Sequence, residues 1–117
     1  AVCRSWIEAE PNSPRAAFHL SACDGGPVPQ RAPDAYVKQV FDSFANSFDA
    51  KLAALSYKAP ALVAEAVALH AGHAGKSLDV LDAGCGTGLC GPLLAPWART
   101  LVGVDLSEGM LRKAVGW

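Results

Sequence analysis

Two short apolar runs separated by a glycine-rich loop constrain this chain more than any other feature. The runs cover residues 78–83 and 100–105. A short, largely apolar run bounded by glycine is typical of a parallel strand that is covered on both faces. The glycines of the loop predict a sharp turn that opens the next helix, because a side chain would obstruct the turn. These glycines are Gly84, Gly86 and Gly88.

The same loop indicates a ligand. Glycine lets a bound molecule approach the main chain, and free amide groups at the start of a helix favour a negative group. Asp105 ends the second run, where a doubly wound sheet places a carboxylate against ribose hydroxyls. The sequence therefore predicts a nucleotide-like or nucleoside-like ligand between the loop and Asp105.

The spacing alone leaves two cofactor classes open. Gly86, Gly88 and Gly91 satisfy the GxGxxG pattern of proteins that bind NAD(P) or FAD. That interpretation requires Gly84 and Cys85 to lie between the strand and the turn. Counted from the end of the strand, the pattern is GxGxG instead. A third interpretation is that the glycines only make a tight connection, with Asp105 an ordinary turn residue.

Segments 82–88 (DAGCGTG) and 105–111 (DLSEGML) resemble motifs I and II of the class I S-adenosylmethionine-dependent methyltransferases. The resemblance implies a Rossmann-like α/β fold, S-adenosylmethionine as cofactor and methyl transfer to an acceptor that these residues do not identify. It implies that Asp105 holds the ribose and that Leu106 and Met110 flank the adenine. It places the rest of the cofactor at Asp82, Gly84, Cys85, Gly86 and Gly88.

The resemblance also implies which part of the reaction the protein residues contribute. Methyl transfer from a sulfonium requires alignment and exclusion of water, so no nucleophile or acid–base pair is expected in the loop. The 117 residues contain only two strand candidates, which predicts the amino-terminal portion of the domain, with an incomplete site. An isolated segment of this kind should bind cofactor weakly and associate through its open strand edges.

Residues 3–23 carry two helical patterns interrupted by EPNSP (10–14), in which Pro14 follows Ser13 as a candidate N-cap. The segments IEAEPNSP (7–14) and AAFHL (16–20) resemble a junction between tetratricopeptide repeats. We therefore expect a helical repeat-like segment at 1–23, a linker rich in glycine and proline at 24–33, and the methyltransferase portion at 34–117. A helical interaction module without cofactor remains an alternative function.

The methyltransferase portion is expected to divide into cap helices at 34–57 and a cofactor-binding core at 60–117. Asp34 is a candidate cap for a helix that carries Val37, Val40, Phe41, Phe44 and Phe48 along one face. FDSFANSFD (41–49) resembles the cap of many small-molecule methyltransferases, which closes over the cofactor. The candidate lid residues are Tyr36, Phe44 and Tyr57. Asp42 and Asp49 are expected on a solvated face. The helix from Pro60 should turn five apolar residues inward: Leu62, Val63, Ala66, Val67 and Leu69.

Composition excludes several classes. The chain is 51% hydrophobic and 18% charged, which is typical of a globular domain. A net charge of −1 without a basic stripe gives nucleic-acid binding no support, and no apolar run is long enough to span a membrane. The four cysteines form no CxxC pair, so no zinc site is expected. Free thiols fit a reducing cytoplasm.

Overall fold

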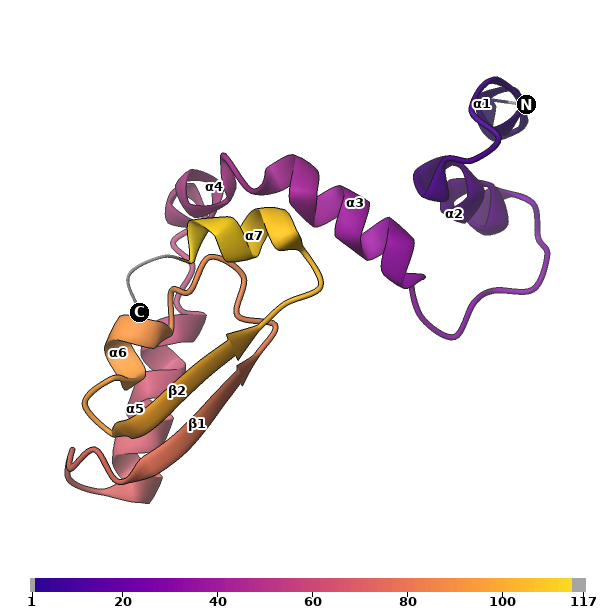
Figure 1. The fold of residues 1–117 in the computed structure, drawn as a ribbon. Coiled ribbons are helices and arrows are strands. Elements are labelled where there is room, and N and C mark those ends of the chain that lie inside the picture. Colours follow the sequence, from indigo (N-terminus) through magenta and orange to yellow (C-terminus); the bar gives the residue numbers. More distant parts are fainter. Residues whose placement is uncertain (1, 115–117) are drawn as a thin grey trace.

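The computed structural model describes residues 2–114, which form an elongated molecule of 57 × 27 × 25 Å. A pair of helices, α1 (Val2–Ala9) and α2 (Pro14–Cys23), lies at one end. At the other end, helices α5 (Ala59–Ala71) and α6 (Gly91–Leu94) accompany a two-stranded sheet. Helices α3 (Asp34–Phe44), α4 (Phe48–Ala54) and α7 (Glu108–Lys113) lie between the two ends (Figure 1).

The start of α2 follows the predicted local chemistry. The hydroxyl of Ser13 accepts a hydrogen bond of 3.3 Å from the N–H of Ala16, and Pro14 occupies the first turn, where its missing N–H costs nothing. The side chains of Cys3 and Cys23 bring α1 and α2 together with their sulfur atoms 3.3 Å apart. The predicted pair of helices is therefore confirmed.

Strands β1 (Leu78–Ala83) and β2 (Ala98–Val104) are parallel, as predicted. Val80 pairs with Leu101 and Ala83 pairs with Val104, so the two strands end together. The glycine loop and Asp105 consequently leave the sheet at the same edge. This mixed α/β arrangement confirms the predicted fold class, a partial Rossmann-like fold with flanking helices.

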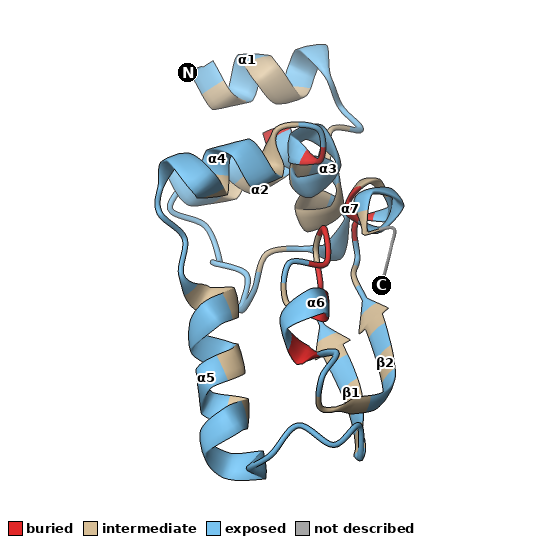
Figure 2. Cartoon of the chain, turned by 90° about the vertical axis from the view of Figure 1, so that its left-hand side faces the viewer, coloured by how far each residue is buried: buried red, intermediate tan, exposed pale blue. Residues whose placement is uncertain are grey.

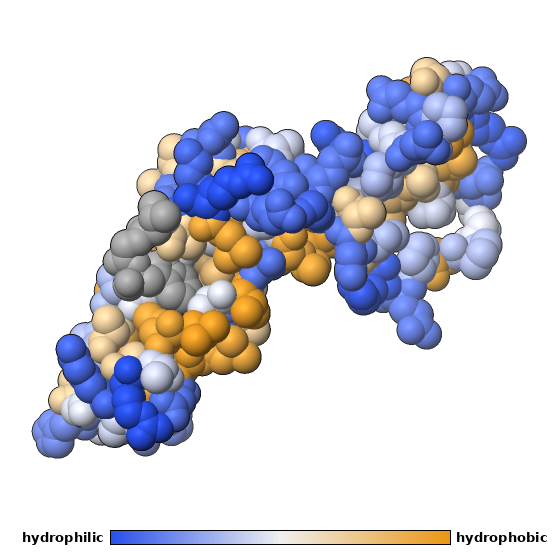
Figure 3. Space-filling view, in the orientation of Figure 1, coloured by the Kyte–Doolittle hydropathy of each residue, from blue (hydrophilic) through white to orange (hydrophobic). Residues whose placement is uncertain are grey.

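The expectation that the strands are covered on both faces is wrong for the described residues. Helices α5 and α6 lie on one side of the strands (Figure 2). Along β1, half-buried and exposed residues alternate, because side chains on a strand point to opposite faces in turn. The other face exposes Leu81, Val102 and Val104 by 65%, 54% and 47%, and Figure 3 shows an apolar area over the strands.

Helix α5 also differs from expectation. Leu62, Val63 and Leu69 are exposed by 58%, 43% and 80%, whereas Val67 is half-buried. The apolar residues of this helix are spread around its circumference rather than gathered on one face, so its sequence does not specify which face is buried. Among residues 2–114 no single helix is long and apolar enough to cross a membrane. Helices α4 and α5 together reach the required length and apolar composition, but an 81° bend separates them.

The cap consists of two helices where the apolar pattern predicted a continuous face. Helix α3 ends at Phe44, and Phe48 begins α4, although the rings of Phe41 and Phe48 still meet with centroids 6.4 Å apart. The N-cap of α3 is Pro33 rather than Asp34. Asp34 instead accepts a hydrogen bond of 2.5 Å from Arg31 on the preceding linker.

Candidate cofactor site

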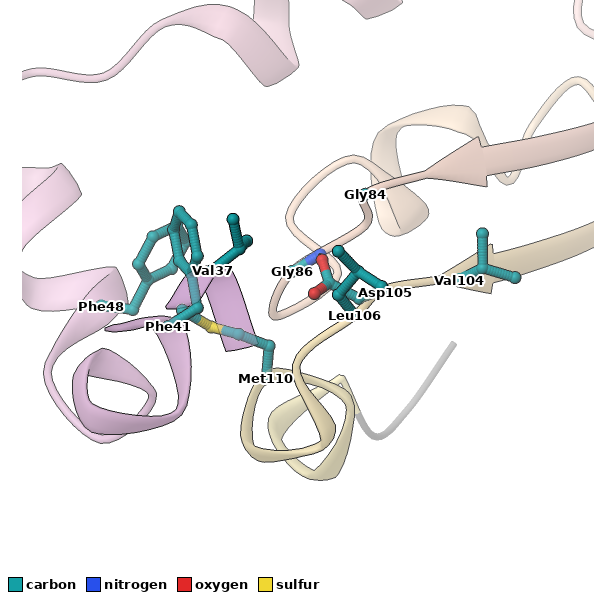
Figure 4. Close-up of a pocket in the computed structure, with 9 residues that line it drawn as sticks. All are labelled: Val37, Phe41, Phe48, Gly84, Gly86, Val104, Asp105, Leu106 and Met110. Carbon is teal, nitrogen blue, oxygen red and sulfur yellow. The ribbon is translucent and has the colours of Figure 1, made fainter. Parts of the chain in front are cut away.

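A cavity of about 570 Å³ lies between the cap helices and the ends of the strands (Figure 4). Its volume falls within the range of small-molecule sites, roughly 300–1,000 Å³. Its walls are mainly apolar, and Asp105 is the charged group on them. The lining residues are Val37, Phe41, Phe48, Gly84, Gly86, Val104, Asp105, Leu106 and Met110.

The carboxylate of Asp105 points toward the glycine loop and is fixed there by two main-chain donors. The N–H of Gly86 donates to Oδ2 at 2.8 Å, and the N–H of Ser107 donates to Oδ1 at 2.8 Å. A carboxylate offers about four acceptor positions, two on each oxygen. Each oxygen of Asp105 therefore keeps capacity for one further donor, which suits a pair of neighbouring hydroxyl groups.

The glycine loop differs from the predicted helix start. Gly84, Gly86 and Gly88 have φ angles of 79°, 55° and 85°, which a helix cannot contain, and α6 begins only at Gly91. The main-chain donors of this loop are not free. The N–H groups of Gly84 and Cys85 donate to the carbonyl of Val104 at 2.8 and 3.0 Å. The prediction of unpaired amides at a helix start is therefore wrong for these residues.

Gly84 keeps the floor of the cavity open. A Cβ built on Gly84 meets no atom within 4 Å, so this position faces free space. A Cβ on Gly86 would lie 3.7 Å from the ring of Phe48, an ordinary contact. Hence the loop and the cap approach each other closely at Gly86 and leave room at Gly84.

Asp82 carries an unsatisfied acceptor next to this space. Its Oδ2 atom is buried and has no hydrogen-bond partner among the described residues. Burial, and then the negative charge of Asp105, raise the pKa of the Asp82 carboxyl above its ordinary value. A buried acceptor without a partner is costly, and a ligand donor placed there would offset that cost.

The predicted site residues divide between two adjoining cavities. Gly84, Gly86, Asp105, Leu106 and Met110 line the larger one. Asp82 and Cys85 line a smaller cavity of about 100 Å³, which shares Gly84, Gly86 and Phe48 with the larger one. Gly88 is buried in the loop and lines neither of these two cavities. Burial raises the pKa of the Cys85 thiol, which suits a small packing residue more than a nucleophile.

The residues that close the cavity differ from the predicted lid. Val37 and Phe41 of α3 and Phe48 of α4 face the strand ends (Figure 4). Tyr36 instead stacks on Phe18 of α2, with ring centroids 4.3 Å apart. Among the other predicted lid residues, Phe44 lies under the ammonium of Lys51, and Tyr57 lines the smaller cavity.

Asp42 and Asp49 are exposed, as predicted, but each also fastens the cap through a hydrogen bond that the sequence interpretation did not foresee. Asp42 Oδ1 accepts a hydrogen bond of 2.5 Å from the hydroxyl of Ser107, and Asp49 Oδ1 accepts one of 2.5 Å from the hydroxyl of Thr87. The two hydroxyls belong to the loops that follow β2 and β1. A signal for these contacts was the presence of a hydroxyl residue in each motif, at 87 and 107.

The fold and the site together define a partial Rossmann-like fold with a cavity at the carboxyl ends of its two parallel strands. Residues 80–116 match a family described as "Methyltransferase domain". The chain is also similar to human methyltransferase-like protein 27, with 39% identity over 75 residues, which cover 63% of this chain and 31% of that protein. No solved structure matches the chain significantly. The matches confirm the resemblance to the class I S-adenosylmethionine-dependent methyltransferases.

Proposed function

We propose that this chain carries the cofactor-binding part of an S-adenosylmethionine-dependent methyltransferase. The single observation that carries the proposal is the carboxylate of Asp105, which the N–H of Gly86 holds at the wall of an apolar cavity. The aligned part of the chain spans about a third of the length of the curated relative, 31%, so activity of a whole enzyme forms part of the proposal.

The residues present fit the proposed cofactor. The two remaining acceptor positions of Asp105 suit the two ribose hydroxyls, and Leu106 and Met110 provide apolar surfaces for the adenine. The open space at Gly84 leaves room for the methionine portion. The unsatisfied Oδ2 of Asp82 would accept a hydrogen bond from its amino group.

When bound, S-adenosylmethionine supplies the methyl group and the positively charged sulfur from which that group is transferred. The protein residues bind the nucleoside, orient it against the strand ends and exclude water. The aromatic rings of Phe41 and Phe48 line the cavity on the side of the cap, where they would exclude water from a bound cofactor. This role requires no reactive side chain in the loop.

Calorimetric titration of the chain with S-adenosylhomocysteine and with NADH tests the proposal. We expect heat of binding with the first ligand, and we expect Gly86→Asp to abolish it because a second carboxylate would face Asp105. Gly25→Asp is the matched control, since Gly25 also has a positive φ angle, 64° against 55° at Gly86, and lies in the linker with no atom within 4 Å of a Cβ. Tight binding of NADH without binding of S-adenosylhomocysteine would instead identify an oxidoreductase domain.

A further inference from the structure

The contact between α3 and the start of α7 is one of the most closely packed parts of the described chain. Ser107 and Met110 are each 1% exposed, and Ala45, just after α3, is 8% exposed. A Cβ built on Gly109 would lie 3.1 Å from Oδ1 of Asp42 and 3.3 Å from Cβ of Ala45. A side chain at position 109 would therefore require Asp42 or Ala45 to move by a few tenths of an ångström.

Asp42 stabilises this contact between α3 and α7 through two hydrogen bonds. Its Oδ1 atom accepts a hydrogen bond of 2.5 Å from the hydroxyl of Ser107 and one of 3.0 Å from the N–H of Gly109. The bond from Ser107, and then the bond from Gly109, hold the pKa of the Asp42 carboxyl below its ordinary value. An ion pair of 3.0 Å between Lys38 and Glu108 lies across the same contact.

Ser107 connects this contact to the cofactor cavity. Its hydroxyl donates to Asp42 and also accepts from the N–H of Met110 at 3.1 Å, which caps α7. Its own N–H donates to Oδ1 of Asp105 at 2.8 Å. One continuous path of hydrogen bonds therefore runs from the cap helix through Ser107 to the carboxylate at the cavity wall and on to the N–H of Gly86.

We propose that Asp42 is a positioning residue for nucleoside binding: by holding Ser107 and Gly109, it fixes the carboxylate of Asp105 in the orientation that accepts the ribose hydroxyls. This inference rests on the proposed function. Asp42 lines neither cavity that contains the predicted site residues, so it acts through Ser107 rather than on the ligand. The same bonds also dock α3, which brings Val37 and Phe41 to the cavity.

The ribose hydroxyls provide a readout that a purely structural role of Asp42 would not change. Affinities for adenosine and for 2′,3′-dideoxyadenosine are measured by NMR titration of the chain. The ratio of the two Kd values reports how well Asp105 meets the hydroxyls. We expect the wild-type chain to prefer adenosine by about tenfold or more, which corresponds to about 1.4 kcal/mol.

The variants are Asp42→Ala, Asp42→Asn and Gly109→Ala. We expect the preference to fall to about threefold or less in Asp42→Ala and to persist in Asp42→Asn, whose amide oxygen still accepts both hydrogen bonds. Gly109→Ala should reduce it too, because the new Cβ pushes Asp42 away, although alanine favours a helix. Asp34→Ala is the control, since Asp34 lies on the same helix and pairs with Arg31 outside the cavity.

The outcomes separate this inference from the proposed function. A wild-type chain that does not distinguish the two nucleosides would contradict the binding of ribose by Asp105, and with it the proposed function. A wild-type preference that Asp42→Ala and Gly109→Ala both leave unchanged would overturn the role of Asp42 alone. Circular dichroism spectra of all variants establish that they fold, and Gly109→Ala provides the test if Asp42→Ala does not.

Discussion

The backbone N–H of Gly86 donates a hydrogen bond of 2.8 Å to Oδ2 of Asp105 and so joins the two loops that follow the parallel strands. The two loops lie side by side because β1 and β2 end in register, at the pair formed by Ala83 and Val104. A carboxylate fixed in this way keeps its remaining acceptors directed at the same place. Under the proposed function, we therefore expect the cavity beside it to favour a ligand that carries two neighbouring hydroxyl groups.

Replacing Asp105 tests that selection. Hydrogen bonds to a charged group contribute about 1.5–3 kcal/mol each, so Asp105→Ala should weaken binding of S-adenosylhomocysteine by at least about tenfold. Asp105→Asn keeps one acceptor oxygen and should lie between the alanine variant and the wild-type chain. Calorimetric Kd values measure the effect. Equal affinities in all three proteins would rule out a role of Asp105 in binding.

Gly84 and Gly25 form a matched pair for testing the loop. Both have positive φ angles, 79° and 64°, and a Cβ on either meets no atom within 4 Å. Alanine at either position should therefore lower the free energy of unfolding similarly, by about 1 kcal/mol. Only Gly84→Ala should lower affinity for S-adenosylhomocysteine, because Gly84 lines the cavity. An equal loss of affinity in both variants would indicate a general effect on stability.

Asp82 and Asp79 should show opposite dependences on pH. Burial raises the pKa of Asp82, so its ionisation costs stability as pH rises through that pKa. Asp82→Asn should therefore raise the melting temperature at neutral pH, and the gain should vanish in acid. Hydrogen bonds from Arg99 lower the pKa of Asp79, so its stabilisation is present above the ordinary aspartate pKa and is lost as pH falls.

Asp79→Asn is thus the control on the same strand, with the opposite sign. It should lower the melting temperature at neutral pH and have little effect in acid. Thermal unfolding of the three proteins between acidic and neutral pH measures both differences. A loss of stability at neutral pH in Asp82→Asn would mean that the charged form of Asp82 is favoured in the fold.

The exposed sheet should drive association of the chain with itself. Strands with unpaired edges and exposed apolar side chains pair readily with another copy. We predict concentration-dependent association in analytical ultracentrifugation and expect Val102→Lys to reduce it. Val28→Lys is the control, because Val28 is 82% exposed but lies in the linker. A chain that stays monomeric at all concentrations would refute this prediction.

Local sequence signals predicted most of the elements. The apolar run at 78–83 matches β1, and Ser13 accepts the capping hydrogen bond that its position before Pro14 indicates. These features depend on residues close together in the chain, where spacing and capping chemistry decide. The resemblance of two short motifs predicted the methyltransferase class, and the family match and the similar human protein confirm that resemblance.

The features that the sequence did not reveal depend on distant partners. The break between α3 and α4 is an exception, because Asn46 and Ser47 are turn and cap residues and Ser47 occupies the N-cap of α4. Asp42 finds its partner Ser107 at a separation of 65 positions, and Gly86 finds Asp105 at a separation of 19. From the sequence alone, a charged residue on a helix face is interpreted as solvated, because a partner far away in the sequence cannot be recognised.

The most direct test of the account is an NMR titration of the isotope-labelled chain with S-adenosylhomocysteine, followed at each backbone amide. We predict that shift changes concentrate in the glycine loop at 84–88, in residues 105–110 and around Phe41 and Phe48, even if affinity is weak. Shift changes confined to the helix pair α1 and α2, or none at the glycine loop and Asp105 up to the solubility of the ligand, would contradict a cofactor site between the loop and the cap.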